Sequence, residues 1–460
     1  MESGHNSLMF SFVFVFIFQA YLLIICHSKS VVKALPGYTG DLPFKLETGY
    51  VGVGENEDVQ LFYLFAESTR NPEVDPLIFY IPGGPGTSSL YTFLYEIGSL
   101  QFDLDNSQDN ITLVSNPNTW TQMANLIIVD IPAGTGFSYA ETKDGWISSD
   151  TILSIQANEF IKKFLLDHPM FLKNPLYIGG ISYTGMLVPK IALEIYEGNE
   201  RGDQPTLNIQ GYIVISPLTD KFKDFNSRFE YAHRMALISD DIYKSAVNNC
   251  YGNYVNIDRT NTLCANSLDQ YEQCIMRLNF DNILEPFCDE NDPEQHCESK
   301  FNMVAESWAN SEAVQRALNV RQGKIGKWEM RNDTIHYSQG KNDTFCYSYD
   351  IFSSFGYHEK LGSKHCQCFI MSGDHDMTFP YVGVEEWISS LNIAVEIPWK
   401  PFYVDSQVGG YEMKYAKNDH YSLTFATVKG AGHMVPYYKP KESTAVIDRW
   451  FSSQTYSSDY

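Results

Sequence analysis

Seven short apolar runs are spaced along the chain, and they constrain its fold more than any other feature of the sequence. Each run is nearly continuous in apolar side chains, which is typical of strands in a parallel sheet that is covered on both faces. Helix-like sequence lies between the third and the fourth run, and such alternation predicts the α/β class. The runs span 61–65, 77–81, 126–130, 176–179, 212–216, 368–371 and 423–428.

The segment 149–168, between the third and the fourth run, carries apolar side chains at helical spacing. Ser149 or Asp150 is suited to cap its first turn. We expect the apolar stripe of this helix to pack against the core and to have no chemical role. Its residues are Ile152, Ile155, Phe160, Phe164 and Leu165.

A serine flanked by glycines follows the fourth run, where residues 180–185 read Gly-Ile-Ser-Tyr-Thr-Gly. A sharp strand-to-helix turn of this kind lifts a serine hydroxyl above the sheet, and small residues must flank it. Ser182 is therefore the predicted nucleophile, although Thr184 breaks the strict G-x-S-x-G spelling. A serine in this position is also a common helix cap, so the prediction depends on its partners elsewhere.

A histidine and two aspartates follow later apolar runs. A serine hydroxyl is a weak nucleophile at neutral pH, and it needs a histidine base that is oriented by an acid. His433 follows the seventh run, whereas Asp374 and Asp376 both follow the sixth, and their spacing does not separate them. The order serine, acid, histidine is that of α/β-hydrolases. We therefore expect that fold, with a mostly parallel central sheet flanked by helices.

Backbone N–H groups must also stabilise the oxyanion of a tetrahedral intermediate. One such donor normally belongs to the residue after the nucleophile, which is Tyr183 here. The glycine-rich turn after the second run is suited to provide another, because Gly83 and Gly84 let the backbone approach a ligand closely.

From about residue 35 to 451 the chain resembles the serine carboxypeptidase family, and more narrowly its plant acyltransferase-like branch. The resemblance implies Ser182, Asp376 and His433 as the catalytic triad, and it settles the acid in favour of Asp376. It implies the amides of Gly84 and Tyr183 as the oxyanion hole. The motifs that carry it are Leu35-Pro-Gly-Tyr, Glu47-Thr-Gly-Tyr-Val-Gly-Val, Gly83-Gly-Pro-Gly, Tyr95-Glu-Ile-Gly, Asn116-Pro-Asn-Thr-Trp, Gly134-Thr-Gly-Phe-Ser-Tyr, Gly180-Ile-Ser-Tyr-Thr-Gly, Leu237-Ile-Ser-Asp, Gly373-Asp-His-Asp and Gly430-Ala-Gly-His.

Two positions depart from the carboxypeptidase pattern. Carboxypeptidases of this family hold the substrate's C-terminal carboxylate with an asparagine before the Gly-Gly pair and a glutamate before the nucleophile. Pro82 and Ile181 stand there, and neither side chain can hydrogen-bond a carboxylate. Peptide hydrolysis is therefore disfavoured, and Ile181, which also replaces the aspartate common in the acyltransferase branch, is expected to favour an uncharged or hydrophobic substrate. The expected substrate-binding residues are Pro82, Gly83, Ile181 and Glu96.

The resemblance implies an acyltransferase of plant specialised metabolism. It would move an acyl group from an activated ester, such as a 1-O-acyl glucose, to an alcohol acceptor through an acyl-serine, and it would require no metal or diffusible cofactor. A serine-type carboxypeptidase or esterase with the same triad is the alternative. A non-catalytic companion paralogue is the second alternative.

The first residues of the chain predict entry into the secretory pathway. Residues 8–25 are apolar and precede small or polar residues, which is typical of a secretory signal peptide at 1–28. No later stretch approaches a membrane span, so we expect no stable span after cleavage, and a vacuolar or extracellular location. The net charge of -23 argues against nucleic acid or anionic membranes as partners. The expected glycosylation sites are Asn110, Asn332 and Asn342.

Between about 217 and 345 the pattern changes to short helical pieces, cysteines and polar turns. We interpret this region as a helical insertion, or lid, that covers the site. The hydrolase core would then comprise residues 29–216 and 346–460, on either side of the insertion 217–345.

Most of the cysteines are expected to pair in an oxidising compartment. The resemblance suggests disulfides between Cys250 and Cys264 and between Cys288 and Cys297. A further family bridge is expected to be missing, because Thr87 replaces one of its cysteines. Its usual partner, which matches Cys346, is then free or differently paired, and Cys366 is a candidate partner.

Overall fold

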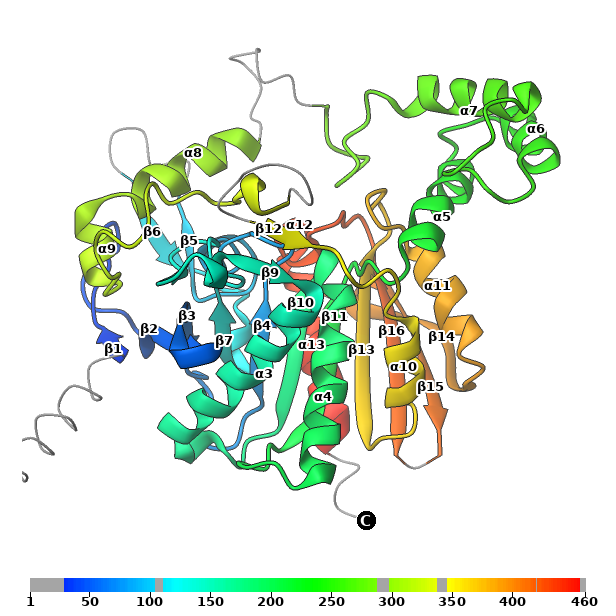
Figure 1. Ribbon diagram of the computed structural model, residues 1–460. Coiled ribbons are helices and arrows are strands. Elements are labelled where there is room, and N and C mark those ends of the chain that lie inside the picture. Colours follow the sequence, from blue (N-terminus) through cyan, green and yellow to red (C-terminus); the bar gives the residue numbers. More distant parts are fainter. Residues whose placement is uncertain (1–28, 104–110, 288–297, 337–345, 419, 456–460) are drawn as a thin grey trace, which may run out of the picture.

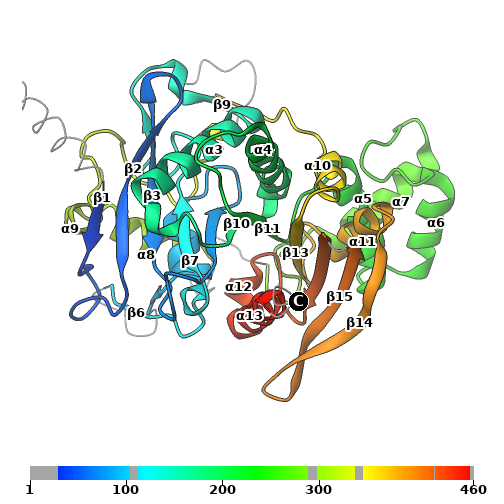
Figure 2. The same cartoon turned by 90° about the horizontal axis from the view of Figure 1, so that it is seen from below.

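The computed structural model describes residues 29–103, 111–287, 298–336, 346–418 and 420–455 (Figure 1). A large sheet runs through the molecule, with helices packed on both of its faces (Figures 1 and 2). The helices of the insertion lie along the upper edge of the sheet in Figure 1. The fold is therefore the α/β-hydrolase type that the sequence predicts, with a mainly helical insertion.

The central sheet has twelve strands, in the order β1-β2-β3-β7-β4-β10-β11-β13-β16-β15-β14, with β8 paired to β3. The six strands from β7 to β16 are mutually parallel, and they include most of the predicted runs. The strands are β1 Lys29–Val32, β2 Leu46–Val53, β3 Val59–Ala66, β4 Leu77–Ile81, β7 Asn125–Val129, β8 Tyr139–Ala140, β10 Leu176–Ile181, β11 Ile209–Ile215, β13 Cys366–Gly373, β14 Ala394–Val404, β15 Gln407–Lys417 and β16 Tyr421–Val428.

Antiparallel strands extend both sides of the parallel centre, and of these the sequence predicted only β3, as the run 61–65. The pair β1–β2 joins one side through β3, and the hairpin β14–β15 joins the other through β16. Most side chains of β14 are exposed, so this strand has no continuous apolar run to reveal it. Only the strands that are buried on both faces carry the pattern that predicted the sheet.

Helices bury the two faces of the sheet separately (Figure 2). The helices α3 (Asp150–Asp167), α4 (Val188–Arg201) and α10 (Phe355–Leu361) cover one face, and α13 (Pro440–Thr455) lies on the other. Neighbouring residues of one strand therefore enter different cores, as Ile213 and Val214 of β11 do. This two-sided burial is the physical reason why the central strands are continuously apolar.

The apolar stripe predicted on α3 is wrong at its first two positions. Ile152 is 38% exposed and Ile155 is 55% exposed, whereas Leu153 and Ala157 are fully buried. At 100° per residue these two isoleucines lie well away from the line of Phe160, which belongs to the buried face. The cap is Ser149, whose side chain accepts a hydrogen bond from the Ile152 amide. The two isoleucines face outward.

The insertion is helical in its described residues, 217–287 and 298–336, and these contain no strand of the sheets. The helices α5, α6 and α7 form an arm at one end of the sheet, and α8 and α9 lie at the other (Figure 1). Their bounds are α5 Lys221–Arg234, α6 Asp240–Cys250, α7 Thr262–Ile275, α8 Glu298–Ala309 and α9 Glu312–Ala317.

Shorter elements complete the fold. The remaining helices are α2 Ser89–Tyr91, α11 Tyr381–Ser390 and α12 Val435–Tyr438, and the remaining strands are β5 Leu100–Phe102, β6 Leu113–Ser115, β9 Ile147–Ser149 and β12 Cys346–Ser348. The 3-10 turns are Glu55–Glu57, Trp120–Gln122, Asp144–Trp146, Pro169–Phe171, Ser182–Met186 and Asp333–His336, with one π-helical turn at Thr92–Glu96.

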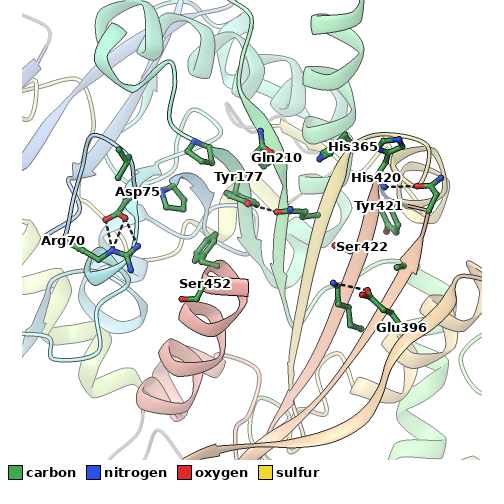
Figure 3. Close-up of a pocket in the computed structure, with 18 residues that line it drawn as sticks. Arg70, Asp75, Tyr177, Gln210, His365, Glu396, His420, Tyr421, Ser422 and Ser452 are labelled. Carbon is green, nitrogen blue, oxygen red and sulfur yellow. Dashed lines mark hydrogen bonds and ion pairs between the residues drawn. The ribbon is translucent and has the colours of Figure 1, made fainter. Parts of the chain in front are cut away.

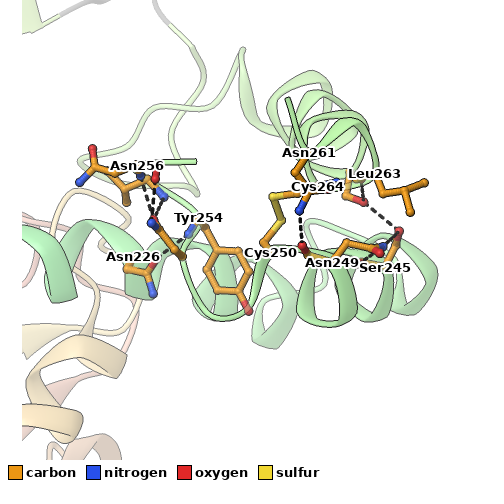
Figure 4. Close-up of a disulfide and its surroundings, with 12 residues drawn as sticks. Asn226, Ser245, Asn249, Cys250, Tyr254, Asn256, Asn261, Leu263 and Cys264 are labelled. Carbon is orange, nitrogen blue, oxygen red and sulfur yellow. Dashed lines mark hydrogen bonds between the residues drawn. A yellow bond between two sulfur atoms is a disulfide. The ribbon is translucent and has the colours of Figure 1, made fainter. Parts of the chain in front are cut away.

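A disulfide joins the end of α6 to the first turn of α7 (Figure 4). It links Cys250 to Cys264, the pair that the family resemblance suggested, and it closes a loop with a sequence separation of 14. A loop of this length contributes roughly 3 kcal/mol of stability in the chain-entropy account. Asn261 reinforces the junction, because its side chain donates to the Asn249 carbonyl and accepts from the Cys264 amide.

The other cysteine predictions have different outcomes. Cys366 is a free thiol buried in β13, so its proposed pairing with Cys346 is wrong. A central strand of the sheet holds it, whereas Cys346 lies in β12, whose backbone pairs with β9. Cys288 and Cys297 lie outside the described residues.

Candidate active site

The predicted catalytic residues all follow the carboxyl ends of neighbouring parallel strands. Ser182 follows β10, Asp376 follows β13 and His433 follows β16, while the glycine-rich turn at Gly83 follows β4. The carboxyl ends of parallel strands meet at one edge of a sheet, which is where ligands bind in open α/β folds. The topology therefore gathers residues that lie far apart in the sequence.

The structure brings the three residues of the predicted triad into one hydrogen-bonded line. His433 Nε2 lies 2.8 Å from Ser182 Oγ, and His433 Nδ1 lies 2.8 Å from Asp376 Oδ2. A neutral imidazole with its proton on Nδ1 donates to the carboxylate and leaves Nε2 to accept from the serine hydroxyl. This arrangement is competent for general-base activation of Ser182.

The two candidate aspartates have separate partners. Asp376 is fully buried, and its second oxygen accepts hydrogen bonds from the amides of Thr378 and Phe379. Asp374 instead accepts from the Gly430 amide and pairs with His375. Only Asp376 therefore contacts the imidazole of the predicted base.

The backbone at Ser182 has the strained geometry of a nucleophile turn. Its φ is +63°, in the left-handed region that serine rarely adopts. The flanking glycines leave no room for side chains: a Cβ at Gly180 would lie 2.3 Å from Thr184 Oγ1, and one at Gly185 would lie 2.6 Å from the Leu218 carbonyl oxygen. Thr184 fits because its hydroxyl donates to the Ile181 carbonyl. This hydrogen bond thus accommodates the threonine that departs from the strict G-x-S-x-G motif.

The glycine-rich turn lies directly against the nucleophile. A Cβ added at Gly83 would lie 3.0 Å from Ser182 Cβ, and Gly84 has a φ of +118°, which favours glycine. Gly84 and Tyr183 both line the pocket that contains Ser182. Their amides are therefore close enough to the nucleophile to be candidates for the oxyanion hole.

Two buried aspartates to which the sequence assigned no role in the site hold this architecture. Asp130 accepts from the Ser88 hydroxyl and the Ser89 amide, and so anchors the glycine-rich turn from behind. Burial raises its pKa to about 6, although these hydrogen bonds favour the charged form. Asp150 accepts from the Tyr183 hydroxyl. The sequence shows only isolated aspartates at these positions, so no local signal distinguishes them.

Charged groups around His433 raise the pKa of its imidazole. Burial lowers the pKa of the imidazole, but the carboxylate of Asp376, followed by those of Asp281 and Glu96, outweighs burial and raises it. Glu96 is buried, lines the pocket and accepts from the Thr92 hydroxyl. Burial raises the pKa of Glu96 to about 7, against the opposing effects of Thr92 and His433.

Replacing Glu96 by glutamine is expected to move the acid limb of the pH profile of kcat/KM to lower pH. The base must be neutral to accept the Ser182 proton, and removing a nearby carboxylate lowers the pKa of His433. The pH profile of ester hydrolysis measures this shift. Glu285→Gln is the control, because Glu285, unlike Glu96, does not line the pocket that His433 lines. An acid limb that stays in place or rises in Glu96→Gln contradicts the expectation.

The pocket above Ser182 has a volume of about 760 Å³, and the insertion forms much of its wall. Of the predicted substrate contacts, Gly83, Ile181 and Glu96 line it, whereas Pro82 is buried beside the turn and does not. Residues of the insertion that line it include Lys221, Phe225, Asp281, Glu306 and Arg331. The insertion therefore shapes access to the nucleophile.

A second hollow, of about 920 Å³, lies at the opposite edge of the sheet (Figure 3). It is lined by residues at the amino ends of the parallel strands, among them Tyr177, Gln210 and Gln367. Ser182, Asp376 and His433 are not among its lining residues. The smaller pocket is therefore the candidate active site.

The remaining predictions concern surface features and targeting. Of the three expected glycosylation sites, Asn332 lies among the residues that the structure describes. Its side chain donates to the Gly134 carbonyl and accepts from the Thr334 amide. Asn110, Asn342 and the predicted signal peptide at 1–28 lie outside the described residues. Across the segments that the structure describes, we find no helix with the length and apolar character to cross a bilayer.

Comparisons with known proteins agree with this fold. A model of the serine carboxypeptidase family matches residues 36–453. Serine carboxypeptidase-like 16 of Arabidopsis thaliana is 43% identical over 439 residues, covering 95% of this chain and 97% of that protein. Serine carboxypeptidase-like 13 of the same plant is 44% identical over 430 residues, covering 93% and 95%.

Among solved structures, the chain is similar to Kex1(delta)P, a prohormone-processing carboxypeptidase from Saccharomyces cerevisiae. The TM-score is 0.73, with 93% of this chain and 96% of that chain covered. The sequence identity is 18%, so this likeness bears on the fold alone.

Proposed function

The chain belongs to the serine carboxypeptidase family, and from this premise we propose that it is an acyltransferase which moves an acyl group from an activated ester to an alcohol. We propose a 1-O-acyl glucose as the donor, in the specialised metabolism of a plant. A secretory route to the vacuole or the cell exterior is part of the same proposal.

The observation that carries the proposal is the apolar side chain next to the nucleophile. Ile181 lines the pocket at the position where carboxypeptidases of the family have a glutamate, and Pro82 replaces their asparagine. A peptide's C-terminal carboxylate would lose a hydrogen bond at each position, and each lost bond to a charged group costs roughly 1.5–3 kcal/mol. An uncharged sugar ester needs neither contact.

In the first half-reaction, Ser182 Oγ attacks the ester carbonyl carbon while its proton moves to His433 Nε2. The amides of Gly84 and Tyr183 stabilise the oxyanion that forms, and Asp376 stabilises the imidazolium. When the tetrahedral intermediate collapses, the bond to the sugar oxygen breaks. That oxygen takes the proton from His433, and glucose leaves an acyl-serine behind.

In the second half-reaction, an alcohol replaces water as the acceptor. Its hydroxyl gives its proton to His433 Nε2 as its oxygen attacks the acyl-serine. Collapse of this intermediate releases the new ester and returns the proton to Ser182 Oγ. The walls contributed by the insertion support this preference, because walls around the nucleophile restrict the access of water to the acyl-enzyme.

The test incubates the purified protein with 1-O-acyl glucoses and an alcohol, and in parallel with a blocked dipeptide. We expect ester formation to exceed hydrolysis of the acyl glucose, and the dipeptide to remain uncut. Ser182→Ala measures the background. Cleavage of the dipeptide would instead identify a carboxypeptidase, and hydrolysis without transfer an esterase. Inactivity toward every substrate would support a non-catalytic companion protein.

A further inference from the structure

Lys221 places a positive charge in the wall of the catalytic pocket. It lies in the first turn of α5, and its side chain lines the same pocket as Ser182. The ammonium sits over three aromatic rings, 4.9 Å from the ring centre of Tyr349, 5.1 Å from that of Phe352 and 5.8 Å from that of Tyr183. This charge therefore lies in the wall of the pocket that contains the nucleophile.

The ammonium of Lys221 has no anionic partner of its own within the described part of the chain. The carboxylates that influence it, Asp150 and Asp350, are already engaged. Asp150 accepts from the hydroxyls of Tyr183 and Tyr347, and Asp350 accepts from the Thr151 amide. Burial lowers the pKa of Lys221, and the two carboxylates only partly offset this effect.

The other charged groups of the pocket differ from Lys221 in this respect. Arg331 pairs with Asp333 at 3.1 Å, and Glu306 pairs with Lys327 at 2.6 Å. Among the lysines and arginines that line the described pocket, Lys221 is therefore the one without an ion pair. A cation that forms no direct ion pair is suited to contact a single negative charge on a ligand.

The position of Lys221 in its helix also argues against a purely structural role. The amino end of a helix carries a partial positive charge, so a lysine in the first turn of α5 is electrostatically unfavourable. Asp220 already caps this helix, because its side chain accepts from the amides of Phe222 and Lys223. The ammonium therefore adds nothing to the cap.

We propose that the ammonium of Lys221 binds a carboxylate carried by the substrate in the catalytic pocket. This inference deepens the proposed function and rests on the same site. A carboxylate fits better than a phosphate monoester, because Lys221 supplies one positive charge and Asp281, which lines the same pocket, disfavours a second negative charge. The uncharged substrate expected from Ile181 stays a prediction for the part of the substrate that contacts Ile181, whereas the carboxylate would belong to the part that reaches Lys221.

The carboxylate belongs either to the acyl group or to the acceptor, and matched substrate pairs separate these sources. For the acyl group, the pair is p-nitrophenyl hemisuccinate and p-nitrophenyl butyrate, whose acyl chains have equal length. For the acceptor, the pair is lactate and propane-1,2-diol, with p-nitrophenyl acetate as donor. Release of nitrophenol measures acylation, and mass spectrometry of the products measures transfer.

Lys221→Met keeps an unbranched side chain without the charge. We expect it to lower kcat/KM for the carboxylate member of one pair by about 10- to 100-fold, the range for loss of a charged hydrogen bond, and to change the neutral member by less than about threefold. Lys221→Arg should recover part of the loss. Lys223→Met is the matched control, because Lys223 lies on the same helix, 4.0 Å from Glu386, and does not line the pocket.

A binding measurement separates recognition from catalysis. Calorimetry with p-nitrophenyl hemisuccinate should show binding to Ser182→Ala, and binding weaker by about 10-fold or more in the variant that also carries Lys221→Met. An equal loss for charged and neutral substrates, a carboxylate preference that survives Lys221→Met, or one that disappears in Arg331→Gln instead would each overturn the proposal. Hydrolysis that depends on Lys221, without any transfer to alcohols, would refute the acyltransferase and leave the carboxylate site standing.

Discussion

Replacing Ser182 by alanine is expected to lower kcat for ester substrates by about 10⁶-fold, to the residual rate that binding and the oxyanion hole sustain. The loss corresponds to about 8 kcal/mol of transition-state stabilisation. It is this large because no other hydroxyl replaces Ser182 Oγ at 2.8 Å from His433 Nε2 among the described residues. Single-turnover kinetics with a p-nitrophenyl ester measure it.

Once Ser182 is removed, removing a second residue of the triad should cost no further activity. In the double variant Ser182→Ala, His433→Ala we expect about the same residual rate as in Ser182→Ala, because the base has no function without the nucleophile. Ser372→Ala is the matched control: this serine is also buried near the end of a central strand, and its hydroxyl has no partner in the described structure. Losses that multiply in the double variant, or a loss below tenfold in Ser182→Ala, would contradict the predicted mechanism.

The centre of the fold was predictable because burial on both faces leaves a simple mark in the sequence. Alternate residues of β11 enter opposite cores, so the whole strand must be apolar. The same mark places Ser182, Asp376 and His433 after strand ends, and the parallel pairing of those strands makes the ends meet at one edge. Local patterns could thus locate Ser182, His433 and the two candidate aspartates, whereas the family resemblance was needed to choose Asp376.

The outer strands of the sheet and the buried face of α3 were less predictable from the sequence, because tertiary contacts decide both. The hairpin of β14 and β15 is half-exposed, so its side chains carry no continuous apolar signal. Ile152 and Ile155 are apolar and yet exposed, since α3 turns Leu153 and Ala157 toward the sheet instead. Apolar composition shows that a helix exists, but it does not fix which face is buried.

Residues that support the site left no sequence signal because their partners are distant in the chain. Asp130 holds Ser89, and Asp150 holds Tyr183 and Tyr347, through contacts that only the folded topology creates. Lys221 likewise meets Tyr349 across more than a hundred positions. In a single sequence, such residues cannot be distinguished from ordinary charged residues of the surface.

Replacing Asp376 by asparagine is expected to lower kcat by about 10⁴-fold with little change in KM. Asparagine keeps an oxygen for the amides of Thr378 and Phe379, so the loop should keep its conformation. Its amide group donates toward His433 Nδ1 and thereby favours the tautomer with the proton on Nε2, which cannot accept from Ser182. Steady-state kinetics and thermal unfolding together measure the effect.

Asp374→Asn is the matched control for this prediction, because it makes the same chemical change two residues away. Asp374 contacts the Gly430 amide and His375 but not His433, and asparagine retains an acceptor for that amide. We expect its kcat to fall by less than about tenfold, since the tautomer of the base is unaffected. Equal losses in the two variants would mean that the turn as a whole, and not the carboxylate beside His433, sets the rate. A large loss in Asp374→Asn alone would exchange the roles of the two aspartates, against the 2.8 Å contact between Asp376 and the imidazole.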